Sequence, residues 1–230
     1  MSTSTHTITV NCNDFITSIK SASEFCDNDA YHGLDSVAIF SKEGMLRISA
    51  LNGHQMFVSD IEIKDGTLPE IEVVKNNGRG FLIPEHLITD ICKIFNKSRA
   101  LMDITITDDG ETFQTYTVTF NANGMAYNFN YKPQNYFPEI DVILSRIDIE
   151  KNNLNTGEYT TNQVLFHPSI LPILSKAFNF VIKDKSIQDK TINFAISDSM
   201  LIFDHKPTNT RVITMCCMPV EYTEEEKDAA

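Results

Sequence analysis

The alternation of apolar and polar residues follows the same order three times along the chain. Each time, a short alternating segment typical of a β-strand precedes a segment with apolar residues three and four positions apart, which is typical of an amphipathic helix. Three further alternating segments follow, separated by turn residues. The pattern therefore predicts three successive βαβββ units and an α+β fold of antiparallel sheets backed by helices.

The predicted elements of the first unit are a strand at 7–10, a helix at 13–26 and strands at 36–40, 45–50 and 55–63. Those of the second unit are a strand at 80–84, a helix at 85–98 and strands at 102–107, 113–120 and 125–131. Those of the third unit are a strand at 163–166, a helix at 168–182 and strands at 191–197, 200–205 and 211–220. Asn13 is the expected N-cap of the first helix.

Two segments fall outside this repeat. Residues 146–162 are polar and rich in asparagine, so they are expected to form a linker or long loop between the second and third units. Residues 223–230 are expected to form a short acidic tail. The chain thus divides into residues 1–145, which hold two units, and residues 163–222, which hold one.

The composition is that of an ordinary globular protein, because 42% of the residues are hydrophobic and 22% are charged. No apolar run approaches the roughly 18 residues of a membrane span. The first ten residues, MSTSTHTITV, lack the basic and apolar regions of a secretion signal. We therefore expect a cytoplasmic protein that does not contact a membrane.

The cysteines show no metal-ligand spacing. They are Cys12, Cys26, Cys92, Cys216 and Cys217. The simpler interpretation is that they are reduced thiols packed as small apolar groups, and a redox role is the alternative.

Four segments resemble, in the same order, motifs of the bacterial β sliding clamps. They read ISALNGHQMFV at 48–58, FLIPEHLITDICKIF at 81–95, YFPEIDVIL at 136–144 and MCCMPV at 215–220. The chain departs from the family pattern at Asn52 and Gln55, where the family has Asp and Arg, and the third segment lacks the family's basic pair. The first two units resemble one complete clamp domain, and the third resembles half of the last domain.

The resemblance implies a DNA clamp-like fold and a polymerase processivity factor rather than an enzyme, with no catalytic residue, metal or cofactor. The implied partners are double-stranded DNA, bound without sequence preference, and peptides of a DNA polymerase and a clamp loader. Family rings contain twelve such units, so chains of three units would need a homotetramer, with third units paired across a two-fold axis. The short architecture favours a phage-encoded protein.

Clamps place their helices on the inner wall of the ring, so the resemblance implies lysine-bearing helix faces directed at DNA. The net charge of −12 argues against nucleic-acid binding, but its distribution matters more than its sum. The candidate DNA-binding residues are Lys20, Lys93, Lys97, Lys176 and Lys183. The alternative is an ordinary solvated helix face.

The resemblance also implies an apolar cleft for a partner peptide. Its lining would be Met56, Pro138, Val142, Ile143, Met218, Pro219 and Val220. Apolar and flexible side chains suit such a cleft, although ordinary core packing would explain the same residues.

Catalytic interpretations have little support in the sequence. The six histidines are scattered without a metal or nucleophile motif, and His54 is expected to be a turn residue. The main alternative to a clamp is an interaction protein or decoy that uses the clamp fold to bind polymerase or loader peptides without encircling DNA. A hydrolase or nuclease, and a regulator that prefers a DNA sequence, are further alternatives.

Overall fold

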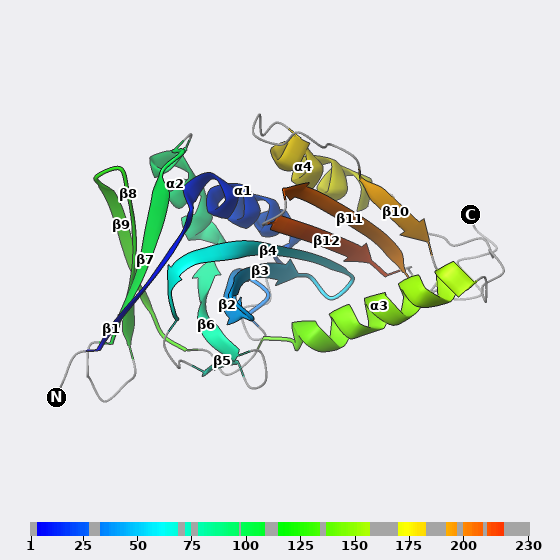
Figure 1. Cartoon of the computed structure of the whole chain (residues 1–230), viewed down its shortest axis with the longest axis horizontal. Helices are drawn as coiled ribbons and strands as arrows, with labels where there is room; N and C mark the ends of the chain where they lie inside the picture. Colours follow the sequence, from blue (N-terminus) through cyan, green and yellow to red (C-terminus); the bar gives the residue numbers. More distant parts are fainter. Residues whose placement is uncertain are drawn as a thin grey trace.

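The computed structural model describes residues 4–27, 33–68, 72–74, 78–96, 98–108, 115–133, 137–156, 170–182, 192–196, 200–208 and 211–218. Over these residues the protein is α+β, as predicted, with antiparallel strands and a small number of helices (Figure 1).

The first unit contains β1 (Thr5–Asn11), α1 (Cys12–Ala22), the 3₁₀ turn η1 (Ser23–Phe25), β2 (Ser36–Lys42), β3 (Met45–Leu51) and β4 (Gln55–Gly66). After the short β5 (Glu72–Val74), the second contains β6 (Gly78–Pro84), α2 (Glu85–Ile94), β7 (Leu101–Asp108), β8 (Tyr116–Ala122) and β9 (Met125–Tyr131). The helix α3 (Ile140–Thr156) leads to α4 (Ile170–Ile182), β10 (Asn193–Ile196), β11 (Leu201–Thr208) and β12 (Arg211–Cys217). The predicted order of elements is therefore present, and the strand expected at 163–166 lies outside the described residues.

Two local expectations need correction. The helix α1 is capped by Asn11 rather than Asn13, because the Asn11 side chain accepts a hydrogen bond from the backbone N–H of Asp14 at 3.1 Å. The segment expected to be a linker or loop is helical as far as Thr156. The polar composition of this segment hid Ile147, which is 1% exposed and lies one heptad after the equally buried Ile140.

The first two units exchange their first strands. β1 pairs with β7 of the second unit, and β6 pairs with β2 of the first unit, both antiparallel. The resulting strand order is β5-β6-β2-β3-β4-β1-β7-β8-β9. Neither unit therefore completes its sheet without a strand from the other.

The long strand β4 joins the third unit to this sheet. One edge of β4 pairs with β3, and the other pairs first with β12 and then with β1. The change of partner brings Gly66, at a φ of +82°, so close to β1 that a Cβ atom there would lie 1.9 Å from the carbonyl oxygen of Thr7. Glycine is required at this point. The sheet continues from β12 to β11 and β10.

Successive residues of β4 point to opposite faces of the sheet. On the inner face, the Phe57 ring packs 5.7 Å from the Phe25 ring, and the hydroxyl groups of Ser59 and Ser18 lie 2.9 Å apart. On the outer face, Asp60 binds Arg47 of β3. The helices α1, α2 and α4 lie together on the inner side, whereas α3 lies on the opposite side (Figure 1).

Candidate functional site

The inner helical face is the first candidate site. The helix α1 lies between α2 and α4 and contacts both (Figure 1). Small side chains of α1 allow a close approach to α4, where the Ser21 hydroxyl donates to the carbonyl oxygen of Ala177 at 3.3 Å. The three helices therefore form one continuous surface.

Three predicted DNA-binding lysines lie exposed on these helices, namely Lys20 on α1, Lys93 on α2 and Lys176 on α4. The sequence showed Asp90 beside Lys93, but it did not show that two of these lysines form ion pairs. Lys93 binds Asp90 at 3.1 Å, and Lys176 binds Glu24 at 3.0 Å. Lys97 and Lys183 lie outside the described residues.

These ion pairs weaken the positive field of the helical face without blocking it. The side chains of Lys93 and Lys176 are 71% and 64% exposed. An exposed ion pair contributes only about 0–1 kcal/mol, because water screens it and both side chains lose freedom. A DNA phosphate can therefore replace the carboxylate of Asp90 or of Glu24 at a small cost in free energy.

The second candidate site is the outer face of the β4–β12 junction. Met56 of β4 lies opposite Cys216 of β12, and just beyond β12 the N–H of Met218 donates to the carbonyl oxygen of His54 at 2.8 Å. The structure therefore brings Met56 and Met218 close to each other at this junction. Pro219 and Val220 lie outside the described residues.

The other predicted residues of the cleft lie at the start of α3. Pro138 and Ile143 are half-buried there, whereas Val142 is 62% exposed. This part of α3 is fixed near Asp60, which is four residues, or about 13 Å, from Met56 along β4. Met56 itself is only 2% exposed, so a bound peptide would have to uncover it.

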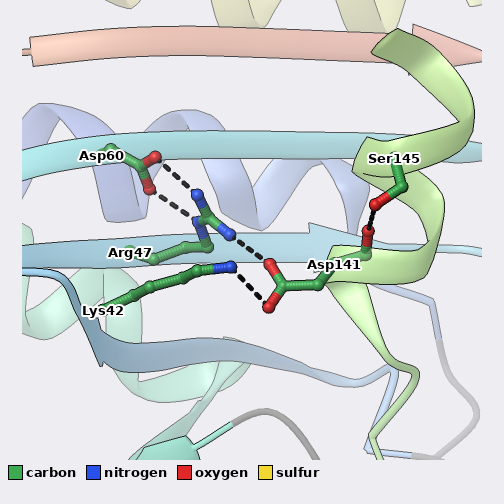
Figure 2. Close-up of polar contacts among 5 residues, drawn as sticks. All are labelled: Lys42, Arg47, Asp60, Asp141 and Ser145. Atoms are coloured by element: carbon green, nitrogen blue, oxygen red, sulfur yellow. Dashed lines mark hydrogen bonds and ion pairs between the residues drawn. The ribbon is translucent and has the colours of Figure 1, made fainter. Parts of the chain in front are cut away.

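A cluster of charged residues holds the start of α3 on the sheet (Figure 2). The guanidinium of Arg47 makes two hydrogen bonds to the Asp60 carboxylate, both 2.8 Å long, and one to Asp141 of α3 at 2.7 Å. Lys42 binds the second oxygen of Asp141 at 2.6 Å. Arg47 and Asp60 are cross-strand neighbours in a hairpin, which the sequence could have indicated, but nothing in it points to Asp141.

The cluster keeps Asp141 ionised. Partial burial opposes the negative charge, but the hydrogen bond and charge of Lys42 and the charge of Arg47 outweigh it and lower the pKa of the carboxyl below its ordinary 3.8. Electrostatic attraction to Lys42 and Arg47 therefore helps to hold the start of α3 on the sheet.

A second ion pair holds α3 further along. Lys151 binds Asp204 of β11 at 2.5 Å, and Thr214 of β12 donates to the same carboxylate at 2.8 Å. Asp141 and Lys151 are ten residues apart, and ten residues of a helix rise about 15 Å. Their partner strands β3 and β11 are three strand spacings apart, which is roughly 14 Å. Because β4 and β12 lie between β3 and β11, α3 crosses the outer face of both.

The β4–β12 junction also contains a buried arginine. Arg211 of β12 is fully buried, donates to the Ser18 hydroxyl at 3.0 Å and lies 3.5 Å from the Asp14 carboxylate. A buried charge is stable only where its partners are in place. Arg211 therefore specifies how the third unit sits against α1.

The cysteines and His54 give little support to a role in nucleophilic catalysis. All five cysteines are free and none is fully exposed, and burial raises the pKa of each thiol, to about 12 for Cys26, Cys216 and Cys217 and to about 11 for Cys92. His54 lies exposed in a turn, as predicted.

Within the described ranges, no three histidine, cysteine or acidic side chains are grouped as metal ligands. None of the helices described there is long and apolar enough to span a membrane.

No family model and no curated protein sequence matches the chain. Solved structures of bacterial clamps do match its fold. The sliding clamp of Pseudomonas aeruginosa, solved with a ligand, superimposes with a TM-score of 0.62 and 11% identity over 94% of this chain and 66% of that chain. The Bacillus subtilis sliding clamp gives 0.57 and 16% over 95% and 65%. The DNA polymerase III β subunit of Thermotoga maritima gives 0.57 and 9% over 96% and 67%.

These matches show that the chain has the DNA clamp fold. The chain spans about two thirds of the length of the clamps it matches. The predicted fold class is therefore confirmed, and the predicted resemblance is confirmed at the level of the fold.

Proposed function

We propose that this protein is a sliding-clamp-like processivity factor that tethers a DNA polymerase to duplex DNA in the cytoplasm and has no catalytic activity of its own. The observation that carries the proposal is the clamp fold, which extends over 94–96% of the chain in the clamps compared above. The gathering of α1, α2 and α4 on one face supports it. A tether of this kind acts by raising the local concentration of polymerase at the primer end.

Primer extension with the cognate polymerase tests the proposal. Products should be longer with the protein than without it, and a bound complex should persist on circular templates while sliding off linear ones. Unchanged product length on both templates would exclude a processivity factor.

The inner lysines would provide the DNA contacts, through phosphates and without sequence preference. The proposed set is Lys20, Lys93, Lys97, Lys176 and Lys183. Lys93→Glu should reduce the slope of log affinity against log salt by about 0.9. Lys64→Glu is the matched control, because Lys64 is also exposed but lies on a strand. An equal loss from both variants would indicate only a change in net charge.

The peptide site would extend from the β4–β12 junction to the start of α3, lined by Met56, Pro138, Val142, Ile143, Met218, Pro219 and Val220. Met218→Ser should weaken binding of a fluorescent polymerase tail peptide about tenfold, because an apolar anchor is lost. Met45→Ser, a change at the far end of β3, should leave that binding unchanged. Loss with both variants would count against the site.

Assembly would follow from the odd number of units. We propose a homotetramer in which the third unit, whose β10 pairs only with β11 among the described strands, is completed across a two-fold axis by a second copy. Light scattering on the chromatographed protein measures the mass directly. A stable monomer would exclude the tetramer.

The pairing of Lys93 and Lys176 with acids favours one alternative, an interaction protein that binds polymerase or loader peptides without loading on DNA. Such a protein would retain the effect of Met218→Ser on peptide binding. It would show no salt-dependent DNA binding and would inhibit extension instead of extending products.

A further inference from the structure

The strand β9 is an open edge without the usual protection. Among the described strands it pairs only with β8, and this pairing has no register shift. Its sequence, MAYNFNY, contains no charged residue, proline or glycine. Soluble proteins normally protect such an edge with a charge, a proline or a bulge, because its free N–H and C=O groups accept another strand. An unprotected edge seven residues long indicates a missing partner strand.

The chain already shows what kind of strand this position accepts. β9 is the last strand of the second unit, as β4 is of the first and β12 of the third. The free edge of β4 is occupied by β12, in antiparallel pairing. Among the described strands, β12 is paired on both sides, with β4 and with β11, so it cannot also pair with β9, and a second molecule can supply the missing strand. We propose that β9 pairs antiparallel with β9 of a second copy of this chain across a two-fold axis.

The hairpin geometry shows which groups face the open edge. Asn123 and Gly124 form a two-residue turn with φ angles of 52° and 74°, the positive values of a type I′ turn. Such a turn is closed by a hydrogen-bonded pair, here Ala122 and Met125, and paired and unpaired positions alternate from there. The backbone groups of Ala126, Asn128 and Asn130 therefore point away from β8 and toward a new strand.

The strand is complementary to itself when Asn128 lies on the axis. Ala126 then faces Asn130 of the partner subunit, and both backbones present free hydrogen-bonding groups. Tyr127 faces Phe129 of the partner subunit, so the axis creates two aromatic cross-strand pairs, a favourable combination. Tyr127 and Phe129 are only half-buried in one chain, and Phe129 already stacks on Phe120 at 6.1 Å. Pairing would cover both rings.

Charge favours this edge over the rest of the surface. Two copies with a net charge of −12 each repel one another. On the outer face of this hairpin, the side chains beside the axis are Asn128 and Asn130 of β9 and Thr119 and Asn121 of β8, all uncharged. The copies can therefore approach here without opposing like charges, and added salt should strengthen the contact.

This inference does not depend on the proposed function, because it follows from strand pairing alone. Its test needs neither DNA nor a polymerase, so the two proposals can fail separately. β9 and β10 lie at opposite ends of the molecule (Figure 1). A chain with two different two-fold contacts, one at each end, can close into a ring of four.

Cross-linking tests the pairing and its register. In Asn128→Cys, the two introduced cysteines would lie about 5.5 Å apart between Cα atoms, as in a hydrogen-bonded antiparallel pair. That distance is within the range of about 4.4–6.8 Å that a disulfide spans. Mild oxidation should therefore convert most of the protein to a covalent dimer on a non-reducing gel. Asn121→Cys, equally exposed on β8, should stay monomeric on the gel, since its mate would be at least about 14 Å away.

Light scattering over a range of concentrations provides the second test. Asn128→Lys places two positive charges against each other on the axis and should raise the dissociation constant for this contact about tenfold or more. Asn121→Lys adds the same charge one strand away and should have little effect. Asn128 is exposed, so at a dilution where both proteins are monomeric its variant should unfold at the same urea concentration as the wild type.

A wild-type protein that remains monomeric at all concentrations would overturn the proposal. An oligomer that neither forms the Asn128→Cys disulfide nor weakens with Asn128→Lys would also overturn it, because such an oligomer would use another surface.

Discussion

The two faces of the sheet around β4 are held by different forces. On the inner face, α1 and the 3₁₀ turn η1 that follows it pack through buried rings and hydroxyl groups, with Phe57 against Phe25 and Ser59 against Ser18. On the outer face, α3 buries Ile140 and Ile147 but presents half-exposed and exposed residues elsewhere, and ion pairs tie it to β3 and β11. Apolar burial is insensitive to pH and salt, whereas ion pairs respond to both. The comparison indicates that the inner helices hold the fold, while α3 can loosen without unfolding it.

The largest effect is expected from the inner face. Phe57 is fully buried, so Phe57→Ala should lower the free energy of unfolding by about 3–5 kcal/mol in urea titrations. Phe194→Ala removes the same ring from the exposed edge strand β10 and should cost about 1 kcal/mol. Similar costs for the two variants would mean that the inner face is not the core.

A smaller effect is expected from the outer cluster. Arg47 is 13% exposed and binds both Asp60 and Asp141, so Arg47→Met should cost about 1–3 kcal/mol. Hydrogen exchange should accelerate in α3 before it changes in α1. In the control, Lys64→Met removes an exposed pair with Glu62 and should cost about 0–1 kcal/mol. Unchanged exchange in α3 would contradict the role given to Arg47.

Acid should release the same end of α3. Because the pKa of Asp141 is lowered in the folded protein, its contribution is complete above its ordinary pKa of 3.8 and is lost as the pH falls through the lowered value. The difference in urea midpoint between wild type and Asp141→Asn should therefore be constant near pH 6 and shrink below about pH 4. A difference that grew on acidification would contradict this assignment.

The smallest effect is expected at the other end of α3. Both members of the Lys151–Asp204 pair are partly exposed, so Lys151→Gln should cost about 0.5–1 kcal/mol, and high salt should reduce this cost. Lys93→Gln, at the more exposed pair with Asp90, should cost almost nothing. An effect of Lys151→Gln that does not change with salt would indicate a packing role.

The order of strands and helices was predictable because each element buries one face, and that requirement leaves a period of two or of about 3.6 in the sequence. The helix α3 was missed because its apolar residues are spread around the helix instead of lying on one face, and because its second half is rich in asparagine. The clamp-like motifs contain both Met56 and Met218, which the pairing of β4 with β12 brings to one junction.

Other features of the candidate sites depend on tertiary structure. The contact between Arg47 and Asp141 joins residues 94 positions apart. No local pattern could show that Met56 would be covered or that Glu24 would pair with Lys176, whereas Asp90 and Lys93 are three residues apart on one helix, a spacing that the sequence does show. The pairing of β12 with β4 likewise joins strand edges that carry no signal in either segment.

The exchange of first strands between the two N-terminal units has a consequence for synthesis of the chain. Thr7 of β1 meets Thr105 of β7, which is 98 residues later. The amino-terminal strand must therefore wait, unpaired on that side, until most of the second unit has left the ribosome. Contacts this distant slow folding, and the waiting edge is exposed to aggregation meanwhile. Nascent chains that end before β7 should accordingly bind chaperones that longer chains release.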